Sequence, residues 1–179
     1  MKIISVSRLT PTIEIDIHPD STLILPGRPF FLPEDGEKRV ARARMAVRIS
    51  RLGKNISKKF APRYYDGVTV GLRLTPPGEI PEEMKGVVSG MDSSTVVGEW
   101  LEPSSVRDAI EVKVGAECAC VENVLPDIDV AIHEISRYMT LKMGDVLLLP
   151  EIMATPELAP SSRLSASLGT VEVLDLKIV

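Results

Sequence analysis

Residues 42–49 read RARMAVRI, and the fold prediction starts from this stretch. Apolar residues alternate in it with arginines, at the period of a β-strand whose successive side chains point to opposite faces. Ala43, Met45 and Val47 are predicted to face a core. Arg42 and Arg44 would then leave the opposite face together. The strand is therefore predicted to have one buried face and one strongly basic face.

Strand-like patterns recur along the chain, and helical patterns are few. Alternation marks 13–17, 68–74 and 112–114, and 171–179 reads as a last strand that would close the sheet. The continuous apolar run 146–149 predicts a strand that is buried on both faces. Helical spacing predicts one amphipathic helix over 126–138 and a shorter one over 55–65, whose Lys58, Lys59 and Arg63 would be solvated. Proline-containing segments, among them 150–160, are predicted loops.

Composition sets limits on the class of protein. The 179 residues suit one domain spanning 1–179, and no segment reads as a linker. The formal net charge of −4 argues against a nucleic-acid partner. No apolar run approaches the ~20 residues that cross a bilayer, and the N-terminus does not read as a signal peptide. We therefore expect a cytoplasmic protein with neither a membrane nor a nucleic acid as partner.

The two cysteines, Cys118 and Cys120, are separated by one residue. On a strand they would share a face and could form a redox pair or half of a metal site. Alternatively, they are two small apolar residues on a buried face, which the sequence favours. The histidines, His18 and His133, have no supporting ligand pattern.

A third arginine lies on the polar face of the strand predicted at 68–74. If that strand and the strand at 42–49 are neighbours with these faces aligned, Arg73 would meet Arg42 and Arg44. Like charges ~5 Å apart repel by roughly 3 kcal/mol at an effective dielectric near 20. Such a cluster therefore needs carboxylate partners or a bound anion. The candidate carboxylates are Asp92, Glu99, Glu79 and Glu83.

Several short motifs follow one another in a recognisable order. After RARMAVRI come SRLGKNI at 50–56, YYDGVTVG at 64–71, SGMD at 89–92, VGEW at 97–100 and TLKMGDV at 140–146. This ordered set resembles the fumarylacetoacetate hydrolase family, metal-dependent enzymes that act on 2-oxo and diketo acids. The resemblance implies an α+β, predominantly β fold, in which a mixed sheet is rolled into a partly open barrel or sandwich with one or two helices. It also implies a dimer.

The resemblance further implies a Mg²⁺ or Mn²⁺ site made of a Glu-x-Glu pair and an Asp. The matching positions here are Arg42, Arg44 and Arg73. The lysine that precedes Gly-Phe-Asp in the family is matched by Ser89, and the Thr-Gly-Thr-Pro after Gly-Asp-Val is matched by residues 147–150, LLLP. The segment that would hold the catalytic histidine, 8–20, is too short. We therefore expect no metal and no other cofactor in this chain.

The leading hypothesis is a family homologue that has lost its catalytic metal site and acts as a binding or partner protein. It would pair with itself or with an active homologue, and it could bind a small carboxylate or phosphate. Candidate anion-binding residues are Arg42, Arg44, Arg73, Ser89 and Ser93, with Asp92 and Glu99 as neutralising carboxylates or a residual base.

The sequence leaves two alternatives open. One is an active hydrolase, decarboxylase or isomerase of 2-oxo or diketo acids with an altered mechanism. The other is that the arginines are exposed strand residues or a structural ion-pair network, because both a network and an anion pocket require arginine beside carboxylate.

Overall fold

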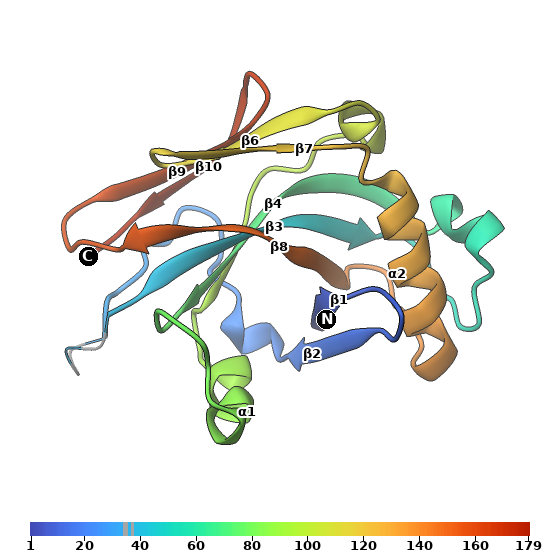
Figure 1. The fold of residues 1–179 in the computed structure, drawn as a ribbon, viewed down its shortest axis with the longest axis horizontal. Coiled ribbons are helices and arrows are strands. Elements are labelled where there is room, and N and C mark those ends of the chain that lie inside the picture. Colours follow the sequence, from blue (N-terminus) through green and yellow to red (C-terminus); the bar gives the residue numbers. More distant parts are fainter. Residues whose placement is uncertain (34–35, 37) are drawn as a thin grey trace.

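The computed structural model describes residues 1–33, 36 and 38–179, and two β-sheets make up most of it (Figure 1). The first sheet curls into a half-barrel and has the strand order β2-β1-β8-β3-β4-β5. β1 and β8 run parallel and the other neighbouring pairs are antiparallel, so the sheet is mixed. In that order the strands span Glu14–His18, Ile3–Arg8, Val146–Glu157, Val40–Ile49, Tyr65–Thr75 and Thr95–Val97.

The second sheet is antiparallel and lies across one face of the first (Figure 1). Its order is β10-β9-β6-β7, formed by Val171–Lys177, Arg163–Leu168, Ile110–Val114 and Glu117–Val121. The helix α2, Leu125–Tyr138, covers one end of the sheets, and α1, Glu82–Gly90, lies on the side away from the second sheet (Figure 1). The short 3₁₀ helices η1, η2 and η3 span Asp20–Thr22, Lys58–Arg63 and Pro103–Val106. The predicted α+β, mainly β fold is confirmed.

The core lies between the two sheets and continues under α2. Met45 on β3 is 1% exposed, and its neighbours Ala43 and Val47 are fully buried, as the alternation predicts. Ile128, Ile132 and Ile135 bring the apolar stripe of α2 into the same cluster. Complete burial of one such large aliphatic side chain contributes about 2 kcal/mol. The other face of β3 is therefore free to carry its arginines.

The predicted loop at 150–160 is wrong, because β8 continues to Glu157. The strand tolerates its two prolines because both fall where its pairing with β3 shifts register. Pro150 lies between the pairs Arg44↔Glu151 and Ala46↔Leu148. Pro156 lies between the pairs Val40↔Glu157 and Arg42↔Ala154. A β-bulge does not need the amide hydrogen that proline lacks.

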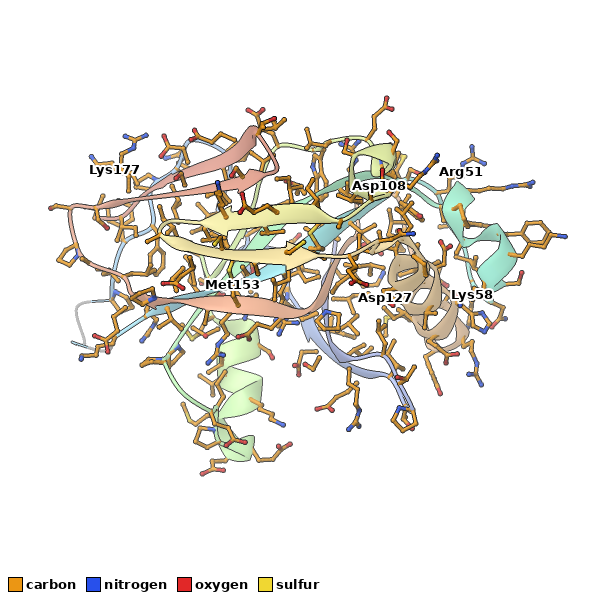
Figure 2. All side chains as sticks on the ribbon, turned by 45° about the horizontal axis from the view of Figure 1, so that its top comes forward. Arg51, Lys58, Asp108, Asp127, Met153 and Lys177 are labelled. Carbon is orange, nitrogen blue, oxygen red and sulfur yellow. The ribbon has the colours of Figure 1, made fainter. Side chains whose placement is uncertain are left out.

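The helices agree with prediction in one case and differ in two. The helix predicted at 126–138 is confirmed as α2. The helix predicted at 55–65 shrinks to the 3₁₀ turns of η2, which contain Pro62, although Lys58 lies at the periphery as expected (Figure 2). Helix α1 was not predicted. None of the helices that the structure describes is long and apolar enough to cross a membrane.

The cysteines do not lie on a buried face, so that expectation is wrong. Cys118 and Cys120 share a face of β7, and both are exposed. β7 is the edge strand of the second sheet and pairs on one side only, with β6. Because alternate residues of a strand point in opposite directions, Ala119 turns to the less exposed side, and the two thiols turn outward.

Candidate functional site

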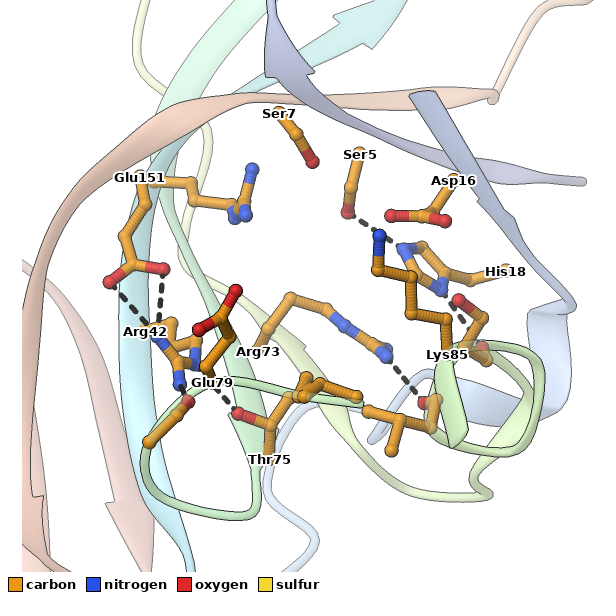
Figure 3. Close-up of a pocket in the computed structure, with 15 residues that line it drawn as sticks. Ser5, Ser7, Asp16, His18, Arg42, Arg73, Thr75, Glu79, Lys85 and Glu151 are labelled. Carbon is orange, nitrogen blue, oxygen red and sulfur yellow. Dashed lines mark hydrogen bonds and ion pairs between the residues drawn. The ribbon is translucent and has the colours of Figure 1, made fainter. Parts of the chain in front are cut away.

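A cavity of about 400 Å³ opens on the face of the first sheet that carries the arginines (Figure 3). Strands β1, β2, β3, β4 and β8 contribute side chains to it, and α1 closes one side. Most of the residues that line it are polar or charged, and this gathering of charged side chains marks it as the candidate site. The lining residues used below are Ser5, Asp16, His18, Arg42, Arg44, Arg73, Glu79, Lys85, Ser89 and Glu151.

Strand register brings the three arginines together. β3 and β4 are antiparallel neighbours in which Arg42 lies opposite Arg73, and Arg44 lies opposite Gly71. Directly opposed residues point to the same face of a sheet. Position 71 has no room for a side chain, because a Cβ there would stand 2.6 Å from Leu148 Cδ2. All three guanidinium groups therefore reach one cavity from two adjacent strands.

Arg42 is held by direct partners. Its Nη1 donates to both carboxylate oxygens of Glu151, at 3.2 and 3.3 Å. Its Nε donates to Thr75 Oγ1 at 2.9 Å, and its Nη2 donates to the carbonyl oxygen of Gly78. The charge of Arg42 is thus largely compensated by Glu151, in a pair whose side chains are 19% and 31% exposed.

Arg73 bonds to neutral groups and is only 4% exposed. Its Nη1 donates to Ser94 Oγ at 3.0 Å and to Thr95 Oγ1 at 2.6 Å, and its Nη2 donates to the carbonyl oxygen of Val88 at 2.9 Å. Burial, followed by the nearby charge of Arg44, lowers the pKa of Arg73 to about 10, while Asp16 opposes the change. The buried positive charge of Arg73 is therefore incompletely compensated.

Arg44 is similar in its surroundings. Its Nη1 donates to the carbonyl oxygens of Val6 and Leu149, at 2.9 and 3.0 Å. Its Nε is buried and has no hydrogen-bond partner among the residues that the structure describes. Burial lowers the pKa of Arg44, against the opposing charge of Glu151. Two of the three arginines thus lack a carboxylate at hydrogen-bond distance in the described structure.

A histidine and a serine from the N-terminal strands face these arginines (Figure 3). His18 Nε2 lies 2.7 Å from Ser5 Oγ, and its Nδ1 lies 2.8 Å from the carbonyl oxygen of Ser89. Burial, and next the charge of Arg73, lower the pKa of His18 to about 4, although its bond to Ser89 opposes this and Arg44 adds to it. His18 is therefore neutral at pH 7.

Not all of the predicted site residues line the cavity. Ser89 does, and its carbonyl oxygen accepts from His18. Ser93 and Asp92 are exposed in the turn after α1, where Ser93 has a φ of +52°. Ser94, which accepts from Arg73, lies next to Ser93 but points inward. Glu99 is exposed and lines a different groove beside Trp100.

The carboxylates that do line the cavity are Asp16, Glu79 and Glu151. Of these, the sequence predicts only Glu79 as a neutralising carboxylate. Alternation of Asp16 with Ile15 and Ile17 was visible in the sequence, but the side of the sheet was not. Glu151 had no visible signal, because regular alternation from Leu148 would place it on the opposite face. The bulge at Pro150 reverses that alternation.

Residues 7–150 match the family described as fumarylacetoacetate (FAA) hydrolase C-terminal. The chain belongs to this family. No curated protein matches the chain in sequence.

Solved structures of the fumarylacetoacetate hydrolase fold superpose on nearly the whole chain. A 2-hydroxyhepta-2,4-diene-1,7-dioate isomerase from Mycobacterium marinum matches with a TM-score of 0.81 at 21% identity, covering 99% of this chain and 74% of that one. A 5-carboxymethyl-2-hydroxymuconate delta-isomerase from Mycobacterium smegmatis matches at 0.79 and 21%, covering 99% and 78%. A maleylpyruvate hydrolase from Sphingobium sp. SYK-6 matches at 0.78 and 19%, covering 99% and 70%. At these identities the likeness establishes the fold alone.

Proposed function

We propose that this fumarylacetoacetate hydrolase family member has lost the metal-dependent chemistry of the family and binds a small carboxylate or phosphate in its arginine cavity. The observation that carries the proposal is the convergence of Arg42, Arg44 and Arg73 on one cavity. These are the positions at which the family resemblance implies carboxylate ligands. With respect to that chemistry the chain is an inactive binding or partner protein.

Electrostatics supports an anionic ligand. Arg42 has Glu151, but Arg44 and Arg73 have neutral hydrogen-bond acceptors and lowered pKa values. For Arg73 the cost of holding the charge in this environment is on the order of 3 kcal/mol. An oxyanion that accepted from these guanidinium groups would offset part of this cost through charge-assisted bonds. The buried Nε of Arg44 offers such a ligand a donor.

The side chains of the cavity do not fit a divalent cation. Mg²⁺ and Mn²⁺ prefer several oxygen ligands around one point, and guanidinium groups cannot ligate them. Among the cavity carboxylates, Glu151 is bonded to Arg42, and Asp16 lies on the other side of the cavity (Figure 3). Within the described ranges, no group of three or more His, Cys, Asp or Glu side chains is placed to hold a metal ion.

An active enzyme is the second candidate function. Structural neighbours bear the names of isomerases and a hydrolase, which favours chemistry on 2-oxo or diketo acids by an altered mechanism. Asp92 and Glu99, the carboxylates expected as a residual base, lie outside the cavity. Turnover of an acylpyruvate or of oxaloacetate by the purified chain, retained in excess chelator, would favour this candidate over the binding protein.

The binding proposal is tested by calorimetry and thermal unfolding with malonate and with inorganic phosphate. Either anion is expected to raise the Tm of the parent protein, and Arg44→Glu is expected to abolish the rise. Arg42→Gln, at a more exposed position, is the milder variant if Arg44→Glu does not fold. Arg51→Glu, on the exposed periphery, changes the net charge equally and is expected to keep binding (Figure 2).

Two outcomes contradict the proposal. One is that no anion shifts the Tm of the parent protein. The other is tight binding of Mg²⁺ or Mn²⁺ in a calorimetric titration, because a retained cation site is incompatible with an arginine cavity.

The proposal includes the partners and the location. The family resemblance supports a cytoplasmic homodimer, or a complex with an active homologue. Light scattering on the purified chain gives the mass of the assembly, and co-purification from the native source shows whether a second related chain is present.

A further inference from the structure

Ser5 and His18 are arranged as a nucleophile and its base. A carbonyl oxygen can only accept a hydrogen bond, so the contact between His18 Nδ1 and the Ser89 carbonyl oxygen requires the proton on Nδ1. In neutral histidine Nε2 then carries the lone pair, and it accepts the hydroxyl of Ser5 over 2.7 Å. This tautomer is the one that can take a proton from Ser5, and Ser89 holds the ring in place.

The pair stands on regular strands. β1 and β2 are antiparallel, with Ser5 opposite Asp16 and Ile3 opposite His18. Ser5 and His18 are therefore diagonal neighbours on one face of this strand pair. Both residues are 3% exposed, and both line the cavity that contains Arg44 and Arg73. The arginines and the Ser–His pair thus meet in one open cavity.

We propose that Ser5 and His18 hydrolyse small esters that carry a carboxylate, with Arg44 and Arg73 holding that carboxylate. The inference rests on the proposed anion-binding function and adds to it a reaction that needs no metal. Asp16 and Lys85 line the same cavity and complete the set of charged groups around the pair, together with Arg42, Glu79 and Glu151.

The reaction has two steps, acylation of Ser5 and hydrolysis of the acyl-serine. Ser5 Oγ bonds to the acyl carbon while its proton passes to His18 Nε2, and the bond from the acyl carbon to the leaving oxygen breaks as His18 returns the proton to that oxygen. Water then attacks the acyl-serine, and its proton moves through His18 to Ser5 Oγ. The products are a free acid and an alcohol.

The charge of the substrate also adjusts the base. Burial and the charges of Arg73 and Arg44 keep the pKa of His18 at about 4 in the free protein. A carboxylate bound to these arginines offsets their effect and raises the pKa of His18 toward the range in which a base works well. Esters without a carboxylate lack this effect, so the cavity is expected to discriminate against them.

The test compares two esters that release the same chromophore, mono-p-nitrophenyl adipate, whose carboxylate is too distant to displace p-nitrophenol rapidly by itself, and p-nitrophenyl hexanoate. The parent protein, in excess chelator, is expected to hydrolyse the adipate ester at least ~10-fold faster than the hexanoate ester, after subtraction of the rates without protein. Ser5→Ala and His18→Gln are expected to lower the rate by about 100-fold or more. Ser165→Ala, an exposed strand serine outside the cavity, is the control and keeps the parent rate. Peptide mass analysis of the quenched parent protein is expected to find the adipoyl group on Ser5, independently of any variant.

The outcomes separate this inference from the anion-binding proposal. Malonate binding without turnover and without an adduct on Ser5 overturns the Ser–His reaction and leaves the anion-binding function standing. Turnover that survives Ser5→Ala also overturns it. Equal rates on the two esters, with no malonate binding, overturn the arginine-held substrate and with it the proposed function.

Discussion

Glu151→Gln is expected to strengthen anion binding, although it removes a charged side chain from the cavity. The cavity contains the cationic side chains of Arg42, Arg44, Arg73 and Lys85 and the carboxylates of Asp16, Glu79 and Glu151. His18 is neutral at pH 7. Glu151 competes with a ligand, because it occupies Nη1 of Arg42 at 3.2 Å. Its replacement by the neutral amide weakens the competition for this donor, because the amide oxygen still accepts but carries no charge, and it removes one repelling charge.

The expected size of the effect follows from Coulomb's law. A charge ~7 Å from a bound anion contributes roughly 2 kcal/mol at an effective dielectric near 20. The partial exposure of the pair reduces this to about 1 kcal/mol, which corresponds to a roughly 5-fold lower Kd for malonate.

Isothermal calorimetry at low ionic strength measures this change, which should shrink as salt is added. Glu157→Gln, on the same strand but paired with Lys38 outside the cavity, is the matched control. Weaker or unchanged binding by Glu151→Gln, with the parent protein binding normally, would refute the reasoning.

Three further perturbations test the fold and its titration. Because the pKa of His18 is about 4 in the folded chain and near 6.5 in the unfolded one, the unfolded chain binds more protons between these values. Stability should therefore fall by up to about 3 kcal/mol from pH 7 to pH 4 in urea titrations, and His18→Gln should flatten this part of the profile. Gly98→Ala should lower the free energy of unfolding by about 2 kcal/mol, because a Cβ there stands 2.7 Å from the Val173 carbonyl oxygen. Gly86→Ala, on the open side of α1, should raise the free energy of unfolding by ~0.5–1 kcal/mol, and thermal unfolding measures both changes. Asp145→Asn should lower the free energy of unfolding by about 3 kcal/mol, because Asp145 is 1% exposed and accepts from both the backbone and the side chain of Lys2. Asp66→Asn, in the exposed pair with Arg48, should lower it by under ~1 kcal/mol.

Local pattern was sufficient to predict much of the sheet and one helix. The alternation of β3 and the apolar run at the start of β8 directly indicate which faces of these strands are buried. The helical spacing of α2 does the same for its buried face. Register shifts leave no such pattern, so the continuation of β8 past Pro150 was missed. Helix α1 has one buried residue, Val88, and therefore too little apolar periodicity to be recognised.

The site was predictable only where strand neighbours could be inferred. Placing Arg73 with Arg42 and Arg44 required one assumption, that the two strands pair, and the register fulfils it. His18 and Ser5 belong to a strand pair whose position against β8 depends on long-range pairing that a single sequence does not encode locally. Ser93 was predicted to meet the arginines, but its neighbour Ser94 accepts from Arg73, and Ser93 is exposed in a turn where its φ is +52°.

The bulge at Pro150 determines which side chain of β8 faces the arginines. One additional residue in β8 changes the parity of the strand, so that an acidic side chain rather than a proline is delivered beside Arg42. Without this bulge the same sequence would turn the carboxylate of Glu151 to the opposite face of the sheet and leave every arginine in place. The charge balance of the cavity thus depends on the backbone geometry at Pro150, a residue that does not itself line the cavity.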